Sequence, residues 1–324
     1  MPLTRRAALG ALPLTLAAPA ILRAQSFPDR PISMITASAP GGPTDTIARL
    51  VADGMSRALG QSVLNVNITG ATISAQRATQ AKADGYTILI NNVGFAAAAT
   101  LYRQLPFSVT ESFAPLGLVS EAAMTVVTRK DFPAADIAEL ITVMKRDGNK
   151  LNLANSGLGS ASHLGGMLLQ QAAGATATTI PFRGSAPAMV ELLAGRIDLF
   201  VDQGTNTVPY LRAGTIKGYA VTSEARVPGL DALPTGIESG LPALVMSTWH
   251  GIYGLAGTPE PAQERLSAAI RAALREPALQ QRFADLVTAP APQDRATIAY
   301  HRKYLQEEVA RWRPLIQAAG VYAD

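Results

Sequence analysis

The chain has 324 residues, no cysteine, 28 basic and 24 acidic residues, and a formal net charge of +4. Without cysteine it can form no disulfide, zinc–thiolate site or thiol nucleophile, and it cannot be lipidated at a signal-peptide cysteine. Its first 24 residues carry three arginines and no acid, so the rest of the chain has a formal charge of only +1, which gives no electrostatic footprint for nucleic acid or an acidic membrane surface.

The N-terminal segment has the pattern of an export signal. Arg5 and Arg6 precede an apolar stretch rich in Ala and Leu, and a small-residue site near Ala24 precedes a more polar start. Thr4-Arg5-Arg6 looks like a twin-arginine signal, although a Sec signal is an open alternative. An uncleaved anchor is disfavoured because the apolar part is short and broken by prolines, whereas a span needs about 20 apolar residues.

The next part of the chain alternates short strand patterns with helical ones, which favours parallel sheets covered by helices. Strands are predicted over residues 31–38, 61–68 and 86–92. Helices are predicted from the paired glycines to Gly60, on a 3.6-residue apolar stripe, and over residues 73–83.

A second series of strands and helices follows a proline-marked region near residues 106–115. A helix is predicted over 136–148, with further helices ending at Gly174, Gly195 and Gly214. The strands of this series are predicted over 124–129, 151–155, 178–182, 197–202 and 216–223.

A Pro- and Gly-rich loop (226–242), an apolar stretch (249–257) and helices from about 260 to 319, with a kink at Pro314, complete the chain. Because about 300 residues exceed a comfortable single core, two lobes are expected.

Five strand ends have unusual composition, and ligands of open α/β sheets bind beyond the carboxyl ends of strands. They read SAPGGPTD (38–45), NNVGF (91–95), NSGLGSASH (155–163), FRGSAP (182–187) and VDQG (201–204). In the first, Gly41 and Gly42 let a ligand approach the main chain, and free N–H groups at the following helix terminus can bind a carboxylate. Ser160 and Ser162 offer hydroxyls in the third. A single glycine-rich turn is often an ordinary connection between a strand and a helix, so the prediction of a binding site rests on several such turns in one chain.

Single polar residues at these ends have alternative roles. Asp45 in a first helical turn can simply favour the helix dipole. Asp202 could select a ligand amine or hold a bridging water, and Arg183 could pair with a second carboxylate or stay solvated. His163, like the other histidines, stands without metal-ligand spacing and is expected to be packed or on the surface.

Enzyme signatures are missing from the sequence. There is no G-x-S-x-G elbow, no Walker loop and no H-E-x-x-H, and GLGSAS lacks the third glycine of a dinucleotide loop. A triad of Ser160, His163 and Asp202 can be imagined, but spacing alone does not support it. No catalytic residue, metal site or cofactor is therefore predicted.

The chain resembles the periplasmic solute receptors of tripartite tricarboxylate transporters, the TctC or Bug family, over its full mature length. The stretches that carry the resemblance, in the same order and spacing, include PDRPISMITASAPGGPTD, ADGYTILINNVG, LYRQLPFSVTESFAPLGLV, LNLANSGLGSASHLGG, IPFRGSAPAMVELLAGRIDLFVDQ and YLRAGTIKGYAVTSEAR. The resemblance implies a type II periplasmic-binding-protein fold, with two α/β lobes joined by crossing strands. It also implies organic-acid ligands held between the lobes by main-chain N–H groups and ordered water.

The resemblance also implies a set of ligand-binding positions in two opposing loops and at two further strand ends. These are Gly41, Gly42, Thr44 and Asp45; Ser156, Gly157, Ser160, Ala161, Ser162 and His163; Asn92, Val93 and Gly94; and Asp202. Four departures from the family pattern bear on ligand identity: NVNITGA (65–71) loses an Arg and a Pro, Gln203 replaces a common Asn, and His250 stands where an aromatic is frequent. Phe95 replaces a small polar residue, and beside the cleft it would favour a flatter or aromatic acid.

The sequence therefore predicts a receptor exported to the periplasm, with one lobe formed by 25–125 and 223–324 and the other by 126–222. Its expected partners are a small carboxylate and, transiently, the subunits of a membrane transporter, with no nucleic acid; a monomer is expected. Two alternatives stay open at this point: a receptor that signals to a membrane sensor, and a hydrolase or lyase on the same scaffold.

Overall fold

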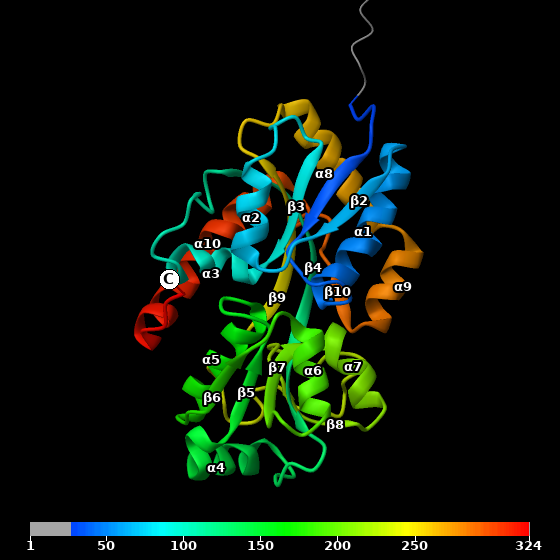
Figure 1. Ribbon diagram of the computed structural model, residues 1–324. Coiled ribbons are helices and arrows are strands. Elements are labelled where there is room, and N and C mark those ends of the chain that lie inside the picture. Colours follow the sequence, from blue (N-terminus) through cyan, green and yellow to red (C-terminus); the bar gives the residue numbers. More distant parts are fainter. Residues whose placement is uncertain (1–26, 324) are drawn as a thin grey trace, which may run out of the picture.

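The structure is a computed structural model that describes residues 27–323. It consists of two α/β halves, one above the other in Figure 1, with strands in the interior of each half and helices outside. The strands are β1 (Ile32–Thr36), β2 (Val63–Asn67), β3 (Thr87–Asn92), β4 (Phe113–Arg129), β5 (Asn152–Asn155), β6 (Thr178–Pro181), β7 (Leu199–Gln203), β8 (Ile216–Val221), β9 (Ser247–Leu255) and β10 (Thr288–Pro290).

The helices cover both halves. They are α1 (Pro43–Leu59), α2 (Ala71–Thr79), α3 (Val93–Leu101), α4 (Ile137–Asp147), α5 (Ala161–Ala173), α6 (Ser185–Leu193), α7 (Gly204–Arg212), α8 (Glu260–Leu274), α9 (Pro277–Asp285) and α10 (Ile298–Ala319). A short 3₁₀ turn, Gly148–Lys150, follows α4.

Each half is built on parallel strands. In the upper half β1 pairs in parallel with β2 and β3, and in the lower half β5 pairs in parallel with β6 and β7. The antiparallel strands β4, β9 and β10 complete the upper sheet, and β4 also pairs with β7 and β8. Because parallel strands end at the same edge, the loops after β1, β2 and β3 face those after β5, β6 and β7.

The long strand β4 connects the two halves. Its residues 113–123 pair with β9, whereas residues 124–129 pair with β7 and β8 of the lower half. The chain returns through a second crossing, where Met246 N–H donates to the carbonyl of Thr222 and the Thr222 hydroxyl donates to the carbonyl of Met246. Two crossing segments of this kind allow the halves to move as units about a hinge.

The strand predicted over 124–129 is eleven residues longer than expected, because β4 begins at Phe113. Pro115 lies inside it, next to a shift in register between β4 and β9, where the lost N–H donor is tolerated. The apolar stretch 249–257 forms most of β9, and the run after Asn92 forms α3, which was not predicted.

Helix ends follow the glycine pattern that the sequence predicted. Gly60 and Gly174 close α1 and α5 in the left-handed conformation, and Gly195 and Gly214 stand just beyond α6 and α7 with positive φ. Pro43 occupies the first turn of α1, where its missing N–H has no cost. Helix α10 continues through Pro314.

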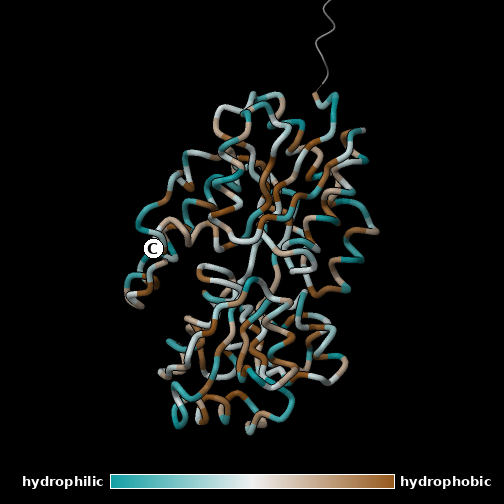
Figure 2. Tube along the Cα trace, viewed as in Figure 1, coloured by the Kyte–Doolittle hydropathy of each residue, from teal (hydrophilic) through white to brown (hydrophobic). Residues whose placement is uncertain are grey.

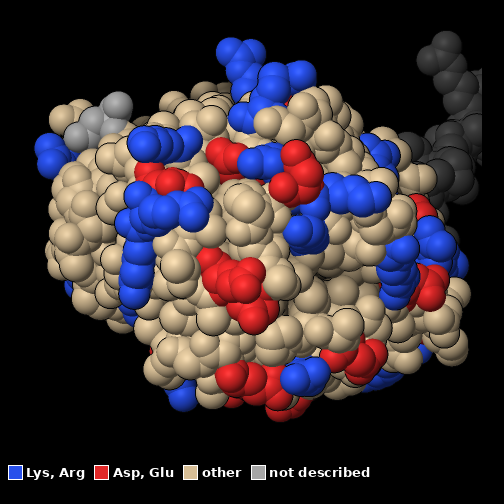
Figure 3. Space-filling view, turned by 90° about the horizontal axis from the view of Figure 1, so that it is seen from below, with Lys and Arg blue, Asp and Glu red and all other residues tan. Residues whose placement is uncertain are grey.

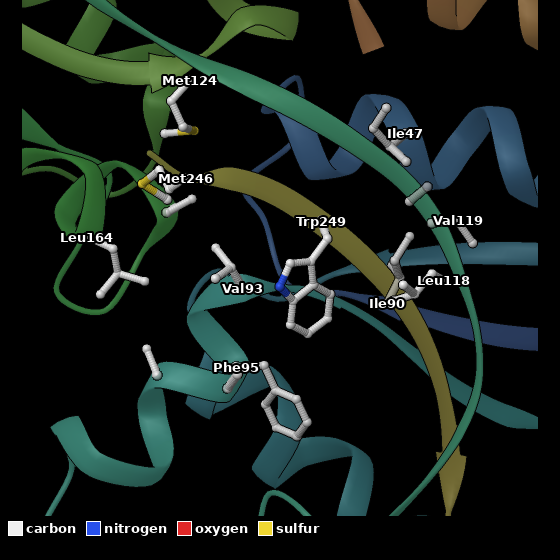
Figure 4. Packing of buried hydrophobic residues seen from close by; sticks show 14 of the residues in the cluster. Ile47, Ile90, Val93, Phe95, Leu118, Val119, Met124, Leu164, Met246 and Trp249 are labelled. Atoms are coloured by element: carbon white, nitrogen blue, oxygen red, sulfur yellow. The ribbon is translucent and has the colours of Figure 1, made fainter. Parts of the chain in front are cut away.

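The core runs through the upper half and into the lower half. Trp249 from β9 and Phe95 from α3 lie in the same apolar cluster as Met246 and Leu164 (Figure 4). Figure 2 shows hydrophobic residues along the interior strands and hydrophilic ones along the outer loops. On the face seen from below, acidic and basic residues are interspersed (Figure 3). No helix between residues 27 and 323 combines the length and apolarity that a membrane crossing requires.

Candidate ligand site between the two halves

A cavity of about 90 Å³ lies between the two halves, large enough for several water molecules or a small ligand. Its walls come from the loops at the ends of β1, β2 and β3 on one side and of β5, β6 and β7 on the other. Among the described residues that line it there is no Lys, Arg or His, and Asp202 is the one with an ionisable side chain. Positive charge in this cavity must therefore come from main-chain dipoles.

Four helices begin at the cavity wall without a side-chain cap, α1 and α2 in the upper half and α6 and α7 in the lower half, and two of them, α2 and α6, follow a glycine of the wall. Helix α2 follows Gly70 and helix α6 follows Gly184, and both glycines line the cavity together with Ala71 and Ser185. Gly70 has φ 103° and Gly184 has φ 119°, a backbone conformation that glycine adopts far more readily than other residues. The first N–H groups of each helix, with the positive end of the dipole behind them, are of the kind that can bind an anion.

The loop before α1 is held by the carboxylate of Asp45. It accepts hydrogen bonds from Gly41 N–H at 2.9 Å, Arg49 Nε at 3.0 Å and Asn67 Nδ2 at 2.8 Å. Burial would raise the pKa of Asp45, but these hydrogen bonds outweigh it and lower the pKa below its ordinary value. Asp45 is buried and absent from the cavity wall, so it shapes the glycine turn rather than facing the ligand.

Three serines bind one another in the opposing loop. Ser156 Oγ lies 2.7 Å from Ser162 Oγ, which also accepts from Ser156 N–H at 2.7 Å and lies 3.1 Å from Ser160 Oγ. Ser160 caps α5 by accepting from His163 N–H at 3.2 Å. Hydrogen bonds between these hydroxyl groups hold the loop together. Ser156, Gly157 and Ser160 line the cavity, and Ser162 is buried behind them.

Asp202 at the end of β7 is 2 % exposed and lines the cavity. Its carboxylate accepts from Ser185 Oγ at 3.0 Å and from Asn206 Nδ2 at 2.7 Å. Burial raises the pKa of Asp202 to about 6, against the opposing effect of these hydrogen bonds. At neutral pH the group is therefore close to its titration range and can respond to a charged ligand.

The halves touch beside the cavity. An added methyl group at Gly94, in the first turn of α3, would overlap the carbonyl oxygen of Gly159 in the opposite half. One at Gly184 would come within 3.2 Å of Ala39 Cβ, again across the gap. The structure therefore has the two halves closed on each other along this seam.

The structure brings seven of the sixteen predicted site residues to the cavity wall. They are Thr44, Asn92, Ser156, Gly157, Ser160, Ala161 and Asp202. Nine others lie behind or beside the wall: Gly41, Gly42, Asp45, Val93, Gly94, Phe95, Ser162, His163 and Arg183. Arg183 is exposed, whereas His163 is 4 % exposed and accepts from Gly159 N–H through Nδ1.

The prediction that Phe95 faces the cleft is wrong. Its side chain is fully buried and packs against Phe107, Phe113 and Tyr253, with ring centroids 6.2, 5.1 and 5.0 Å away. The aromatic ring therefore belongs to the core of the upper half, and it gives no reason to expect a flat or aromatic acid.

The imagined Ser–His–Asp triad is not assembled. Ser160 and His163 are used in capping α5, and the partners of Asp202 are Ser185 and Asn206. Burial lowers the pKa of His163, but the ring accepts a main-chain N–H instead of meeting a hydroxyl nucleophile. The geometry required of a nucleophile, base and orienting acid is absent among these residues.

Several wall residues were missed by the sequence reasoning. The cavity is also lined by Ala37, Ser38, Ala39, Pro43, Thr69, Gly70, Ala71, Leu158, Gly184, Ser185 and Gln203. Gly70, Gly184 and Gln203 stood in stretches that the sequence analysis singled out, and a glycine before an uncapped helix was the signal that could have identified Ala71 and Ser185 as anion-binding positions.

The family model described as “Tripartite tricarboxylate transporter family receptor” (TctC) matches residues 47–321. The chain belongs to this family. Its receptors are substrate-binding proteins of the periplasm, and the earlier resemblance is confirmed.

Solved structures of TctC-like proteins confirm the two-lobed binding-protein fold. The periplasmic binding protein BugD matches with a TM-score of 0.88 and 39% identity, over 92% of this chain and 100% of that one. MatC from Rhodopseudomonas palustris, with bound malate, matches at 0.86 and 34% identity, over 90% and 100%. A second R. palustris protein, with adipate, matches at 0.86 and 29%, over 91% and 99%. The predicted export signal, residues 1–24, lies outside the described residues of this TctC-family chain.

Proposed function

We propose that this TctC-family chain is an exported receptor that captures a small carboxylate between two lobes and delivers it to a tripartite tricarboxylate-type membrane transporter. The lobes are proposed as residues 25–125 with 223–324, and residues 126–222, after removal of a signal peptide near Ala24. The observation that carries the proposal is the pair of uncapped helix N-termini, α2 and α6, that open from opposite halves onto one cavity without a cationic side chain.

A carboxylate suits these donors better than a neutral ligand does. Free N–H groups at a helix terminus favour negative charge, and hydrogen bonds to a charged group contribute about 1.5–3 kcal/mol each. A ligand that meets donors from both halves binds the closed form more tightly than the open form, and this difference shifts the hinge equilibrium towards closure. The closed receptor then presents a defined surface to its transporter.

Similar proteins support the ligand class. MatC was solved with malate and the second R. palustris protein with adipate, and both molecules are small dicarboxylic acids. The name of the family supports the transporter as partner. The proposed contact residues are the seven predicted wall residues together with Ala71 and Ser185.

Thermal melting of the mature chain against malate, adipate, other small acids, sugars and amines tests the proposal. A ligand at 100 times its Kd adds about 2.7 kcal/mol of stability, which is a rise of about 4 °C in Tm for a chain of this length. Stabilisation by sugars or amines, with no response to any acid, would refute it.

A single main-chain donor can be removed to test the binding mode. Proline is tolerated at the first helical position and lacks an N–H, so Ala71→Pro deletes one donor of α2 while keeping the helix start. We expect the Kd for the stabilising acid to rise roughly tenfold or more. Ala71→Gly, which retains the N–H, is the matched control, and equal affinities of the two variants would contradict the proposed contact.

A further inference from the structure

A buried chain of hydrogen bonds leads from the cavity wall to the crossing strand β4. Thr44 lines the cavity, its Oγ1 lies 3.2 Å from His250 Nε2, and His250 Nδ1 lies 3.0 Å from Ser120 Oγ. His250 on β9 and Ser120 on β4 are both fully buried. A ligand can therefore meet one end of this chain, and the other end is fixed inside the protein.

The partner of Thr44 on its other side has a fixed orientation. Asn92 Oδ1 accepts from Gly94 N–H at 3.0 Å, so the amide of Asn92 turns its Nδ2 towards Thr44 and donates to Oγ1 at 3.2 Å. Thr44 Oγ1 thus already accepts one hydrogen bond. Its own proton goes either to His250 or into the cavity.

His250 carries a single ring proton. Burial lowers its pKa to about 3, so the ring is neutral at physiological pH and exists as one of two tautomers. With the proton on Nδ1, His250 donates to Ser120 and accepts from Thr44, and Thr44 offers the cavity only a lone pair. With the proton on Nε2, His250 donates to Thr44 and accepts from Ser120, and the Thr44 proton faces the cavity.

The count of buried donors separates the two tautomers. The Nδ1–H form leaves the hydroxyl proton of Ser120 without an acceptor, because the described residues provide Ser120 Oγ with no side-chain or main-chain partner other than His250. A buried donor without a partner is costly. The Nε2–H form pairs the protons of Ser120 and His250 and leaves the Thr44 proton for a ligand or water in the cavity.

We propose that His250, as its Nε2–H tautomer, makes Thr44 a hydrogen-bond donor and so selects ligands that place an acceptor oxygen at this wall over ligands that place a hydroxyl or ammonium donor there. This inference rests on the proposed function for the identity of the acceptor, a carboxylate oxygen. His250 is a positioning residue, since it acts on the ligand through Thr44.

Nitrogen-15 NMR of the imidazole rings tests the tautomer directly. The chain has three histidines, His163, His250 and His301, so His250 is assigned by the signal that His250→Gln removes. We expect a proton-bearing Nε2 and an unprotonated Nδ1 at pH 7, both in the free protein and in the presence of saturating malate or adipate. An Nδ1–H tautomer in either state overturns the inference.

Affinity measurements test the contribution of the hydroxyl. Thr44→Val removes the hydroxyl at similar volume, and we expect its Kd for malate or adipate to rise roughly ten- to hundredfold. Thr44→Ser retains the hydroxyl donor, and its Kd should be at least tenfold lower than that of Thr44→Val. Equal binding by Thr44→Val and the wild type overturns the inference.

The two proposals fail in different ways. If neither malate, adipate nor another acid binds the wild type, the proposed function fails, and the tautomer in the free protein still decides whether His250 orients Thr44 as a donor. If acids bind but the tautomer is Nδ1–H, or the Thr44 hydroxyl is dispensable, the proposed function stands and the role of His250 fails.

Discussion

Replacing Gly94 with alanine is expected to weaken ligand binding by opposing contact between the halves. Gly94 lies in the first turn of α3, and its Cα faces the main-chain carbonyl of Gly159 across the seam. The added methyl carbon would overlap that oxygen by roughly 1 Å of an ordinary contact distance. A main-chain atom cannot turn aside as a flexible side chain would, so the halves must separate at this point.

The size of the effect follows from the cost of overpacking. An extra methyl group in a closely packed place costs about 1–3 kcal/mol. If closure is needed for tight binding, this cost appears in the affinity and raises the Kd about five- to 150-fold. Each half should largely keep its own stability, because the severe overlap is with Gly159 of the opposite half, the contact with Asn92 Oδ1 in the same half is 3.2 Å, and alanine is the better helix former.

Calorimetric titration with the acid that stabilises the wild type measures the Kd, and thermal melting without ligand checks the fold. Gly204→Ala is the matched control. Gly204 also lies in a first helical turn without positive φ, and its added Cβ would have its nearest neighbour, the carbonyl oxygen of Ala123, at 3.4 Å. Wild-type affinity in Gly94→Ala would refute the reasoning, since it would mean that the seam between Gly94 and Gly159 does not close on the ligand.

Three further predictions concern charge and packing. An anion beside Asp202 raises the pKa of this carboxyl group above its value of about 6 without ligand, so the complex binds more protons than the free receptor. Calorimetry should therefore show the affinity for malate or adipate falling from pH 6 to 8, by at most about tenfold per pH unit. Asp202→Asn should lose this trend, and an affinity that rises with pH would contradict it. Asp45→Ala should lower the free energy of unfolding by about 1–3 kcal/mol at pH 7, measured by urea titration. Because hydrogen bonds lower the pKa of Asp45 in the folded state, this loss of stability should shrink as the pH falls below 4 towards that pKa. A loss that does not change with pH would argue against the role of the carboxylate. Phe95→Leu should cost about 1–3 kcal/mol of stability and leave the ratio of malate to adipate affinity unchanged, whereas an altered ratio would place Phe95 at the ligand after all.

The sequence predicted the elements whose signals are local. The apolar stripe of α1, its first-turn proline and its closing Gly60 all lie within one stretch of chain, and the structure contains that helix. Helix α3 was missed because it is apolar and buried over most of its length, so no amphipathic period marks it. The extent of β4 was missed because pairing with β9, far along the chain, overrides the local effect of Pro115.

For the candidate site, too, the sequence predicted local features, and the structure was needed for the rest. Strand ends followed by glycine turns are visible in the sequence, and they led to Thr44, Ser156, Ser160 and Asp202, all on the cavity wall. The direction of a side chain at such a turn is not visible. Phe95 stands one residue after Gly94 at a strand end, yet packing with other aromatic rings takes it into the core.

The sequence by itself predicted alternating strands and helices, because periodicity and glycine stops are properties of neighbouring residues, and its motif order carried the resemblance to the TctC family that the family model confirms. Only the tertiary structure decided which donors converge. The N-termini of α2 and α6, the seam at Gly94 and the contact of Thr44 with His250 each join residues far apart in the chain. Such contacts depend on how whole elements pack, and local sequence preferences do not specify that packing.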